Sequence, residues 1–342
     1  MNIYLALALS ALLSFVISFA LGFAVIPWLR KLKFGQTILE EGPVWHKSKQ
    51  GTPTMGGIMF IISTIISTIV VFLTDYLLKG SIFSSGSVIE SQMKVKLVAG
   101  MALAIGFGII GFADDYIKVV KKRNLGLTII QKTVAQMLLM FGYLLTLTLN
   151  HLTYIKIPFV GAVELSWFSW IFGICVIYGT VNAVNFTDGI DGLCAGVTSI
   201  TAIAFVVAAL MSKFLGVSVL AAALFGGCVG YLIWNYYPAK VMMGDTGSMF
   251  LGGLVVALAY AIDCPLILLL FGLLYVIEGL SDVLQIGYFK ITHGKRIFKM
   301  APIHHHFEMC GWKERKIVTV FSLVNLIGCI AGLLIYYFGI VK

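Results

Sequence analysis

Residues 193–237 read LCAGVTSITAIAFVVAALMSKFLGVSVLAAALFGGCVGYLIWNYY and contain a single charged side chain, Lys213. An α-helix needs about 20 predominantly apolar residues to cross the hydrocarbon core of a bilayer. The stretch is long enough for two crossings, and the lysine lies between them. It therefore predicts two membrane-spanning helices, over residues 193–211 and 217–237.

Apolar runs of this kind continue in both directions from that pair. Of the 342 residues, 60% are hydrophobic and only 11% are charged, whereas a soluble domain carries about 25% charged residues. A chain with so few charges cannot cover a water-facing surface, so we predict one all-α polytopic membrane domain over residues 1–342. The spans expected are about ten: 3–29, 55–78, 95–113, 127–149, 165–184, 193–211, 217–237, 248–262, 265–289 and 317–340.

The basic residues predict the orientation of these spans. Loops that follow the odd-numbered spans hold 17 Lys and Arg residues, whereas the opposite loops hold five. Because basic loops remain in the cytoplasm, the odd-numbered loops are expected there and both termini outside. The net charge of +9 is thereby explained by topology, and no nucleic-acid partner is expected. The outer segment 150–164, with β-branched residues, a proline and a glycine, predicts a small β-hairpin.

Five carboxylates gather where apolar runs end on the predicted cytoplasmic face. A charge inside a bilayer costs about 2.5–3.5 kcal/mol on insertion scales, so such residues are functional candidates. Clustered acids need a counterion, and Mg²⁺ favours one or two carboxylates together with phosphate oxygens. The sequence therefore predicts phosphoryl chemistry at Asp114, Asp115, Asp188, Asp191 and Asp245.

Two readings of the adjacent pair Asp114–Asp115 remain open. Neighbouring side chains on a helix point about 100° apart, so the two cannot ligate one ion equally. One acid could meet metal or substrate while the other pairs with a lysine. Alternatively, both are interfacial acids neutralised by Lys118 and Lys122, one and two turns later.

Polar residues also recur in NAVNFTDGIDGL, which contains Asn182, Asn185, Asp188 and Asp191. The two asparagines share a helical face, and each Asp-Gly step then breaks the helix. Such a break exposes backbone N–H groups beside carboxylates, which suits a phosphate and its metal. The simpler alternatives are that Asp191 caps the following helix, and that Asp245 caps the span after it.

Two further loops carry polar motifs on the predicted cytoplasmic side. Residues 42–57 read GPVWHKSKQGTPTMGG, in which Lys49 offers a charge for phosphate, although a plain solvated loop would look similar. Residues 300–308 read MAPIHHHFE. Consecutive histidines diverge and make poor zinc ligands, so we expect them to hydrogen-bond phosphate or a polar substrate: His304, His305 and His306.

Taken in order along the chain, these motifs resemble the phospho-N-acetylmuramoyl-pentapeptide transferase family of bacteria. The matching segments are HxxKxGTPTMGG (46–57), DDY (114–116), NAVNxTDGIDGL (182–193), MGDTGS (243–248) and MAPIHHHFE (300–308). The acidic motifs occur in the wider polyprenyl-phosphate sugar-1-phosphate transferases, whereas GTPTMGG and the triple histidine are more discriminating. A ten-helix, homodimeric plasma-membrane enzyme with a broken or bent ninth span is implied.

The resemblance also implies a reaction and a set of roles. UDP-MurNAc-pentapeptide and undecaprenyl phosphate would give lipid I and UMP, with Mg²⁺ as cofactor. Asp245 is the expected metal ligand, with Asp188 facing the metal or phosphates, and Asp114 is the expected partner of the lipid phosphate beside Asp115. The residues expected to face phosphates or metal are Lys118, Lys122, Lys132 and Asn182, of which Lys118 and Lys132 are expected to be catalytic together with Asp114, Asp115 and Asp245. The nucleoside pocket is expected to be lined by Lys49, Gly189, Asp191 and Asn235, and Thr54 and Asn185 are further expected substrate-binding residues. His304, His305 and His306 look like the substrate-recognition loop, with His305 also expected to be catalytic.

One residue departs from the family pattern. Where members often have a phenylalanine that stacks on uracil, this chain has Met242. Two alternatives are weighed beside the resemblance: a relative that transfers GlcNAc-1-phosphate, and an ion-coupled transporter. A transporter would place its charges in the middle of helices, whereas the acids here lie at one face.

Overall fold

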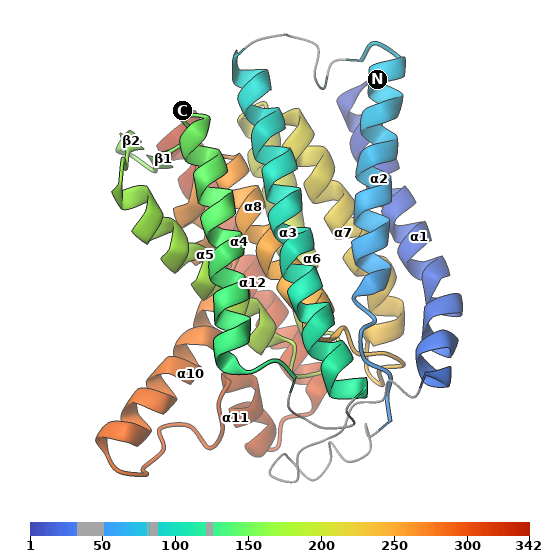
Figure 1. Cartoon of the computed structure of the whole chain (residues 1–342), viewed down its shortest axis with the longest axis vertical. Helices are drawn as coiled ribbons and strands as arrows, with labels where there is room; N and C mark the ends of the chain where they lie inside the picture. Colours follow the sequence, from blue (N-terminus) through green and yellow to red (C-terminus); the bar gives the residue numbers. More distant parts are fainter. Residues whose placement is uncertain (33–50, 81, 83–87, 121–125) are drawn as a thin grey trace.

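The computed structural model describes residues 1–32, 51–80, 82, 88–120 and 126–342, and it is a bundle of long helices (Figure 1). Within these residues, nine helices are long and apolar enough to cross a membrane, and a bent pair brings the number to ten. The expectation of about ten spans is confirmed. The long helices are α1 (Ile3–Lys31), α2 (Ile58–Leu77), α3 (Val88–Val120), α4 (Ile129–Leu149), α5 (Phe168–Thr187), α6 (Leu193–Met211), α7 (Leu215–Asn235), α8 (Gly244–Ala261), α10 (Leu273–Ile291) and α12 (Glu314–Tyr336).

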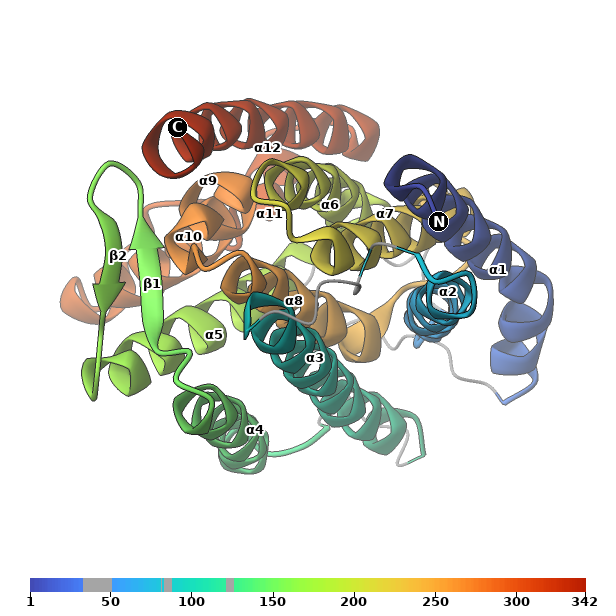
Figure 2. The ribbon, with the colours of Figure 1, turned by 90° about the horizontal axis from the view of Figure 1, so that it is seen from above.

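Helix α8 is the centre of the bundle, although its sequence gives the shortest of the expected spans. Viewed from above, it lies among α3, α5, α6 and α7 (Figure 2), and 89% of its span is buried. Glycines allow this close packing, since a Cβ at Gly253 would lie 3.0 Å from the Ala104 Cα of α3. A helix that contacts other helices on every side needs no long lipid-facing surface, which explains its modest hydropathy.

The ninth span is broken, as the family resemblance implies. A 3₁₀ turn (η2, Pro265–Ile267) and the short α9 (Leu268–Phe271) meet α10 at an angle of 87°. The buried Asn325 of α12 satisfies backbone groups at the break, because its Oδ1 accepts from Leu274 N (3.2 Å) and its Nδ2 donates to Phe271 O (3.3 Å). Irregular backbone at membrane depth requires such internal partners. Helix α10 then diverges from the bundle (Figure 1).

The predicted hairpin is present at the opposite end from the acidic motifs. Strands β1 (Tyr154–Ile157) and β2 (Gly161–Glu164) pair antiparallel, with Tyr154 opposite Glu164. The hairpin is attached to the residues that follow α8, because Lys156 N donates to the Asp263 carbonyl (2.6 Å). The carboxylate of the same Asp263 pairs with the buried Lys96, which attaches this segment to α3. Both termini lie at this end of the bundle (Figure 1). The expectation that both termini lie outside the cell stays a prediction, and their position at one end of the bundle is compatible with it.

Helix α3 is longer than the expected span 95–113, since it runs from Val88 to Val120. Lys94, which precedes the expected span, consequently lies inside the helix, as Lys96 does. At the other end, Asp114, Asp115 and Lys118 lie on regular helix within its last two turns. The remaining short elements are α11 (Ile303–Met309) and a π-helical turn, η3 (Tyr337–Val341).

Candidate active site

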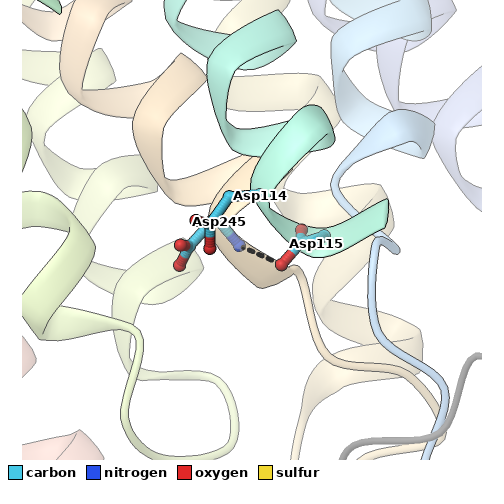
Figure 3. A group of neighbouring side chains, drawn as sticks. All are labelled: Asp114, Asp115 and Asp245. Atoms are coloured by element: carbon cyan, nitrogen blue, oxygen red, sulfur yellow. Dashed lines mark hydrogen bonds between the residues drawn. The ribbon is translucent and has the colours of Figure 1, made fainter. Parts of the chain in front are cut away.

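Three carboxylates from two helices meet at the end of the bundle opposite the termini. Asp114 and Asp115 lie in the last turns of α3, and Asp245 lies in the first turn of α8 (Figure 3). One oxygen of each lies within 4.8 Å of the other two. The two helices approach closely because residue 111 is glycine, where a Cβ would lie 2.1 Å from the Asp245 carbonyl oxygen.

Asp115 caps helix α8 from a neighbouring helix. Its Oδ2 accepts hydrogen bonds from Thr246 N (2.9 Å) and Thr246 Oγ1 (2.7 Å), and its Oδ1 accepts from Asp245 N (3.2 Å). The first amides of a helix lack partners inside the helix, and a carboxylate there also interacts favourably with the helix dipole. The alternative that Asp245 caps its own helix is wrong, because no side chain of α8 makes the N-cap bond.

Asp245 is held by two lysines and an amide from three other segments. Its Oδ2 accepts from Lys132 Nζ of α4 (2.9 Å) and Lys118 Nζ of α3 (3.2 Å), while its Oδ1 accepts from Asn185 Nδ2 of α5 (2.9 Å). Asn185 also donates to the Ser248 hydroxyl (2.7 Å). The carboxylate is thus oriented from both sides, although 19% of its side chain remains exposed.

Asp114 shares a lysine with Asp245. Lys118 Nζ lies 2.6 Å from Asp114 Oδ2, and the other oxygen accepts from Leu127 N (2.8 Å). Asp114 is therefore the acid of the pair that contacts Lys118, whereas its neighbour Asp115 is hydrogen-bonded to α8. Both side chains are almost fully buried.

The loop between α5 and α6, residues 188–192, brings two more acids beside this cluster. Both Asp-Gly steps break the helix as expected, since α5 ends at Thr187 and α6 begins at Leu193. Burial and the negative charges of Asp245, Asp115 and Asp191 raise the pKa of Asp188 well above its usual range, and a hydrogen bond from the Gly244 amide opposes that rise. Asp188 is thus a carboxyl that a nearby cation would favour in its charged form.

Asp191 and Asn235 connect this loop to the segment before α8. Asp191 Oδ2 accepts from Ala239 N (2.9 Å), while Asn235 accepts from Gly192 N (3.0 Å) and donates to the Val241 carbonyl (2.9 Å). The alternative that Asp191 caps α6 is wrong, because the N-cap residue is Gly192 at φ +81° with no side-chain bond. Both side chains are buried, and through these hydrogen bonds to backbone groups they join the two segments.

The GTPTMGG motif fixes the same segment from its other side. Met242 N donates to the Pro53 carbonyl (2.8 Å), and Gly56 N donates back to the Met242 carbonyl (2.9 Å). The Thr54 hydroxyl lies beside Gly244, where a Cβ would come within 2.7 Å of it. The Met242 side chain is buried. The predicted phosphate ligands Lys49 and Lys122 lie outside the described residues.

The three histidines of α11 diverge, as expected from their spacing. His304 Nδ1 lies 3.0 Å from Glu278 Oε2 of α10, and His305 Nδ1 lies 2.6 Å from Glu308 Oε2. His306 Nδ1 accepts from the Lys299 amide (3.1 Å). Among the described residues, no histidine belongs to a cluster that could hold a metal.

Most of the predicted site residues are therefore placed around one end of α8, but they contact different groups. For Asn182 the contact shown is within its own helix, because its amide donates to the Tyr178 carbonyl of α5 (2.8 Å). Sequence reasoning gave no role in the reaction to Ser248 or Glu278. Ser248 could have been found, since it lies three residues after Asp245 and so faces the same side of α8.

The donor set at this site fits a hard divalent cation. Carboxylate oxygens are the ligands that Mg²⁺ and similar ions prefer, and three converge here. Lys118 and Lys132 supply two positive charges to three aspartates. The cluster therefore has more negative than positive charges, and the pKa of the neighbouring Asp188 is raised. A bound cation would neutralise this excess of negative charge.

Comparisons with known proteins agree with this geometry. A family model described as Glycosyl transferase family 4 matches residues 97–263, and a phospho-N-acetylmuramoyl-pentapeptide-transferase signature matches residues 49–61. Proteins named phospho-N-acetylmuramoyl-pentapeptide-transferase are similar over nearly their whole length. That of Caldanaerobacter subterraneus is 46% identical over 319 residues, covering 93% of this chain and 95% of that protein.

The chain belongs to the phospho-N-acetylmuramoyl-pentapeptide-transferase family. Relatives of the same name in Acetivibrio thermocellus and Bacillus subtilis are 44% and 42% identical, covering 94% and 95% of this chain and 92% and 96% of theirs. The signature of the transferase covers the loop that pairs with Met242. The glycosyl transferase model covers most of α3 and all of α4–α8, including the whole three-carboxylate cluster.

Proposed function

We propose that this transferase moves phospho-MurNAc-pentapeptide from UDP-MurNAc-pentapeptide to undecaprenyl phosphate, giving lipid I and UMP for peptidoglycan synthesis. The observation that carries the proposal is the convergence of three aspartates and two lysines at one end of an apolar helix bundle. That placement lets a membrane lipid and a water-soluble nucleotide meet. The names of the relatives supply the identity of the two substrates.

Positioning and charge neutralisation account for most of phosphoryl-transfer catalysis. Lys118 and Lys132, which flank Asp245, would reduce the repulsion between the lipid phosphate and the donor diphosphate. Asp245 would hold Mg²⁺, with Asp114 and Asp188 as neighbouring carboxylates. When bound there, the ion supplies positive charge to the phosphate oxygens.

The chemical step we favour is direct in-line attack. An oxygen of the lipid phosphate forms a bond to the β-phosphorus of the UDP-sugar, and the bond from that phosphorus to the oxygen bridging it to UMP breaks. Asp114, whose carboxylate already shares Lys118 with Asp245, lies where it can orient the lipid phosphate. A covalent phospho-aspartate on the same residue is the competing route, and it predicts UMP release before the lipid is added.

We also propose the surroundings of the site. The excess of Lys and Arg in the loops at this end of the bundle supports a site that faces the cytoplasm of a bacterial plasma membrane. The family resemblance supports a homodimer. The three histidines and the loop around Thr54 would recognise the donor, together with Lys49, Gly189, Asp191 and Asn235.

The test is UMP release by purified protein from defined donors, with and without Mg²⁺. Release from UDP-MurNAc-pentapeptide that requires undecaprenyl phosphate and stops on chelation is the expected result. Equal or better release from UDP-GlcNAc would instead assign the chain to GlcNAc-1-phosphate transfer. Turnover that is indifferent to chelators would overturn the role of the carboxylate cluster.

A further inference from the structure

A buried histidine–carboxylate pair connects α10 to α11 at the edge of the site. His304 Nδ1 lies 3.0 Å from Glu278 Oε2, and both side chains have no exposed surface. Burying two ionisable groups is unfavourable unless each is hydrogen-bonded and held in good geometry. The pair is therefore unusual for a contact between a membrane-level helix and a short loop helix.

The pair leaves its remaining polar atoms without partners. Across the described part of the chain, neither His304 Nε2 nor Glu278 Oε1 has a hydrogen bond. An unsatisfied buried polar atom costs about 1–3 kcal/mol, and native proteins retain few of them. A carboxylate that accepts from one imidazole nitrogen fixes the orientation of the ring and determines what the other nitrogen faces.

The other nitrogen of His304 faces Gly189, in the loop between Asp188 and Asp191. A Cβ built at Gly189 would lie 2.1 Å from His304 Nε2 and 2.6 Å from Cε1. Only glycine fits under this ring. The imidazole ring of His304 therefore packs against the loop that carries Asp188 and Asp191, beside the three-carboxylate cluster.

Helix α10 holds His304 in place by a second contact. The Ser281 hydroxyl, one turn after Glu278, accepts from the Ile303 amide at the start of α11 (2.9 Å) and donates to the Glu278 carbonyl (2.7 Å). On its other side α10 packs against α5, where a Cβ at Gly279 would lie 3.1 Å from the Ala183 Cβ. Helix α10 therefore contacts both the helix that precedes the aspartate loop and the helix that carries His304.

We infer that Glu278 is a positioning residue for the transfer reaction, acting through His304 on Gly189 and so on the loop that carries Asp188. The inference rests on the proposed function, because it assigns Glu278 a part in that reaction. In this role Glu278 acts through His304 and not by direct contact with a substrate. Its effect is to hold one imidazole against one glycine, so that the adjacent carboxylate keeps its place beside Asp245.

The experiment compares Glu278→Ala and Glu278→Gln with Asp282→Asn in UMP release and UMP binding. Asp282 is the carboxyl one turn later on α10 that interacts electrostatically with both Glu278 and His304. If the hydrogen bond matters, Glu278→Ala lowers kcat at least about tenfold, the equivalent of about 1.4 kcal/mol. Glu278→Gln, which keeps a hydrogen-bonding group, recovers part of that loss, and Asp282→Asn stays within about twofold of wild type.

A double-mutant cycle with Gly189→Ala tests the route of the effect. Because the added methyl group already displaces His304, Glu278→Ala in that background is expected to cost much less than it does alone. Strictly additive losses would overturn the inference. So would loss of kcat in Glu278→Ala that matches a loss of folded protein in thermal unfolding and of UMP-binding sites, since that pattern indicates a purely structural role.

The wild-type protein separates the two proposals. If it releases no UMP from UDP-MurNAc-pentapeptide, the proposed function fails. If it does so and Glu278→Ala is as fast, the proposed function stands and the inference on Glu278 falls.

Discussion

Asp115 of α3 accepts hydrogen bonds from both the backbone amide and the side-chain hydroxyl of Thr246 of α8, at 2.9 and 2.7 Å. One helix therefore supplies the N-terminal cap of the other. The residue before Thr246 is Asp245, the acid that two lysines contact. The cap consequently fixes the place of the central carboxylate relative to α3.

The substitution Thr246→Val tests the hydrogen bonding by which Asp115 caps α8. The substitution keeps the shape of the side chain and the backbone amide donor but removes the hydroxyl donor to the buried Asp115, so we expect the free energy of unfolding to fall by about 1–3 kcal/mol. The rate of UMP release should also fall, because Asp245 is then held less firmly in its position relative to α3. Thermal unfolding in detergent measures the first effect, and Thr246→Ser is the control that retains the hydroxyl. Equal melting temperatures for Thr246→Val and the wild-type protein would contradict the role of Asp115 as the cap of α8.

Asp245→Asn is expected to lower UMP release at least about a hundredfold, the equivalent of about 2.7 kcal/mol in the barrier. The amide keeps the size of the side chain but loses the charge that Lys118, Lys132 and a cation would share. Membrane insertion and folding should persist. Glu164→Gln, an acid of the hairpin at the far end of the bundle, is the matched control and should retain wild-type rates. Normal turnover by Asp245→Asn would disprove its central role.

Mg²⁺ is expected to raise the melting temperature of the wild-type protein. Saturation at about 100 times the dissociation constant adds about 2.7 kcal/mol to the stability of the folded state. The same titration with Asp245→Asn should give little or no rise, because a principal ligand is missing. A rise of equal size in both proteins would place the ion elsewhere.

Asp188 makes the stability of the chelated protein depend on pH. Its pKa is raised in the folded protein, so the folded state holds this proton more tightly than the unfolded state does. Stability from this group is therefore highest below its ordinary pKa of about 4 and declines as the pH rises toward the raised value. With EDTA present, we expect Asp188→Asn to lose less stability than wild type between pH 5 and about pH 8. If the melting temperatures of wild type and Asp188→Asn fall by the same amount over this pH range, the prediction is wrong.

Met242→Phe tests the one departure from the family pattern. Aromatic stacking is worth about 0.5–1.5 kcal/mol beyond buried area, so a phenylalanine in contact with uracil should tighten UMP binding by about two- to tenfold. The side chain at this position is buried, and the backbone amide of Met242 donates to the Pro53 carbonyl. Isothermal titration with UMP measures the change. Unchanged affinity would show that residue 242 does not contact the base.

The spans were predictable because each needs only local hydropathy. Two of their properties were not. The start of α3 at Val88, seven residues before the expected span, was not predictable, because the pairing of Lys96 with Asp263 that holds this end joins residues distant in the chain. The central position of α8 likewise depends on contacts from several helices, which no single stretch of sequence contains.

The acidic residues of the site were predictable from their positions at the ends of apolar runs. The division of labour among them was not. Both members of the Asp114–Asp115 pair looked alike in sequence, yet one pairs with Lys118 and the other caps α8. The partner of Glu278 could not be predicted, since it is a histidine 26 residues later in the chain that folds onto it.

The brevity of α8 determines how far a lipid must travel. Its 18 residues give a length of about 27 Å, close to the roughly 30 Å thickness of the hydrocarbon layer. If α8 crosses this layer from one face to the other, Asp245 in its first turn is level with the boundary between acyl chains and headgroups. An acceptor with a long hydrocarbon tail could present its phosphate at the depth where lipid phosphates already reside, with no need to be lifted out of the bilayer or drawn into it.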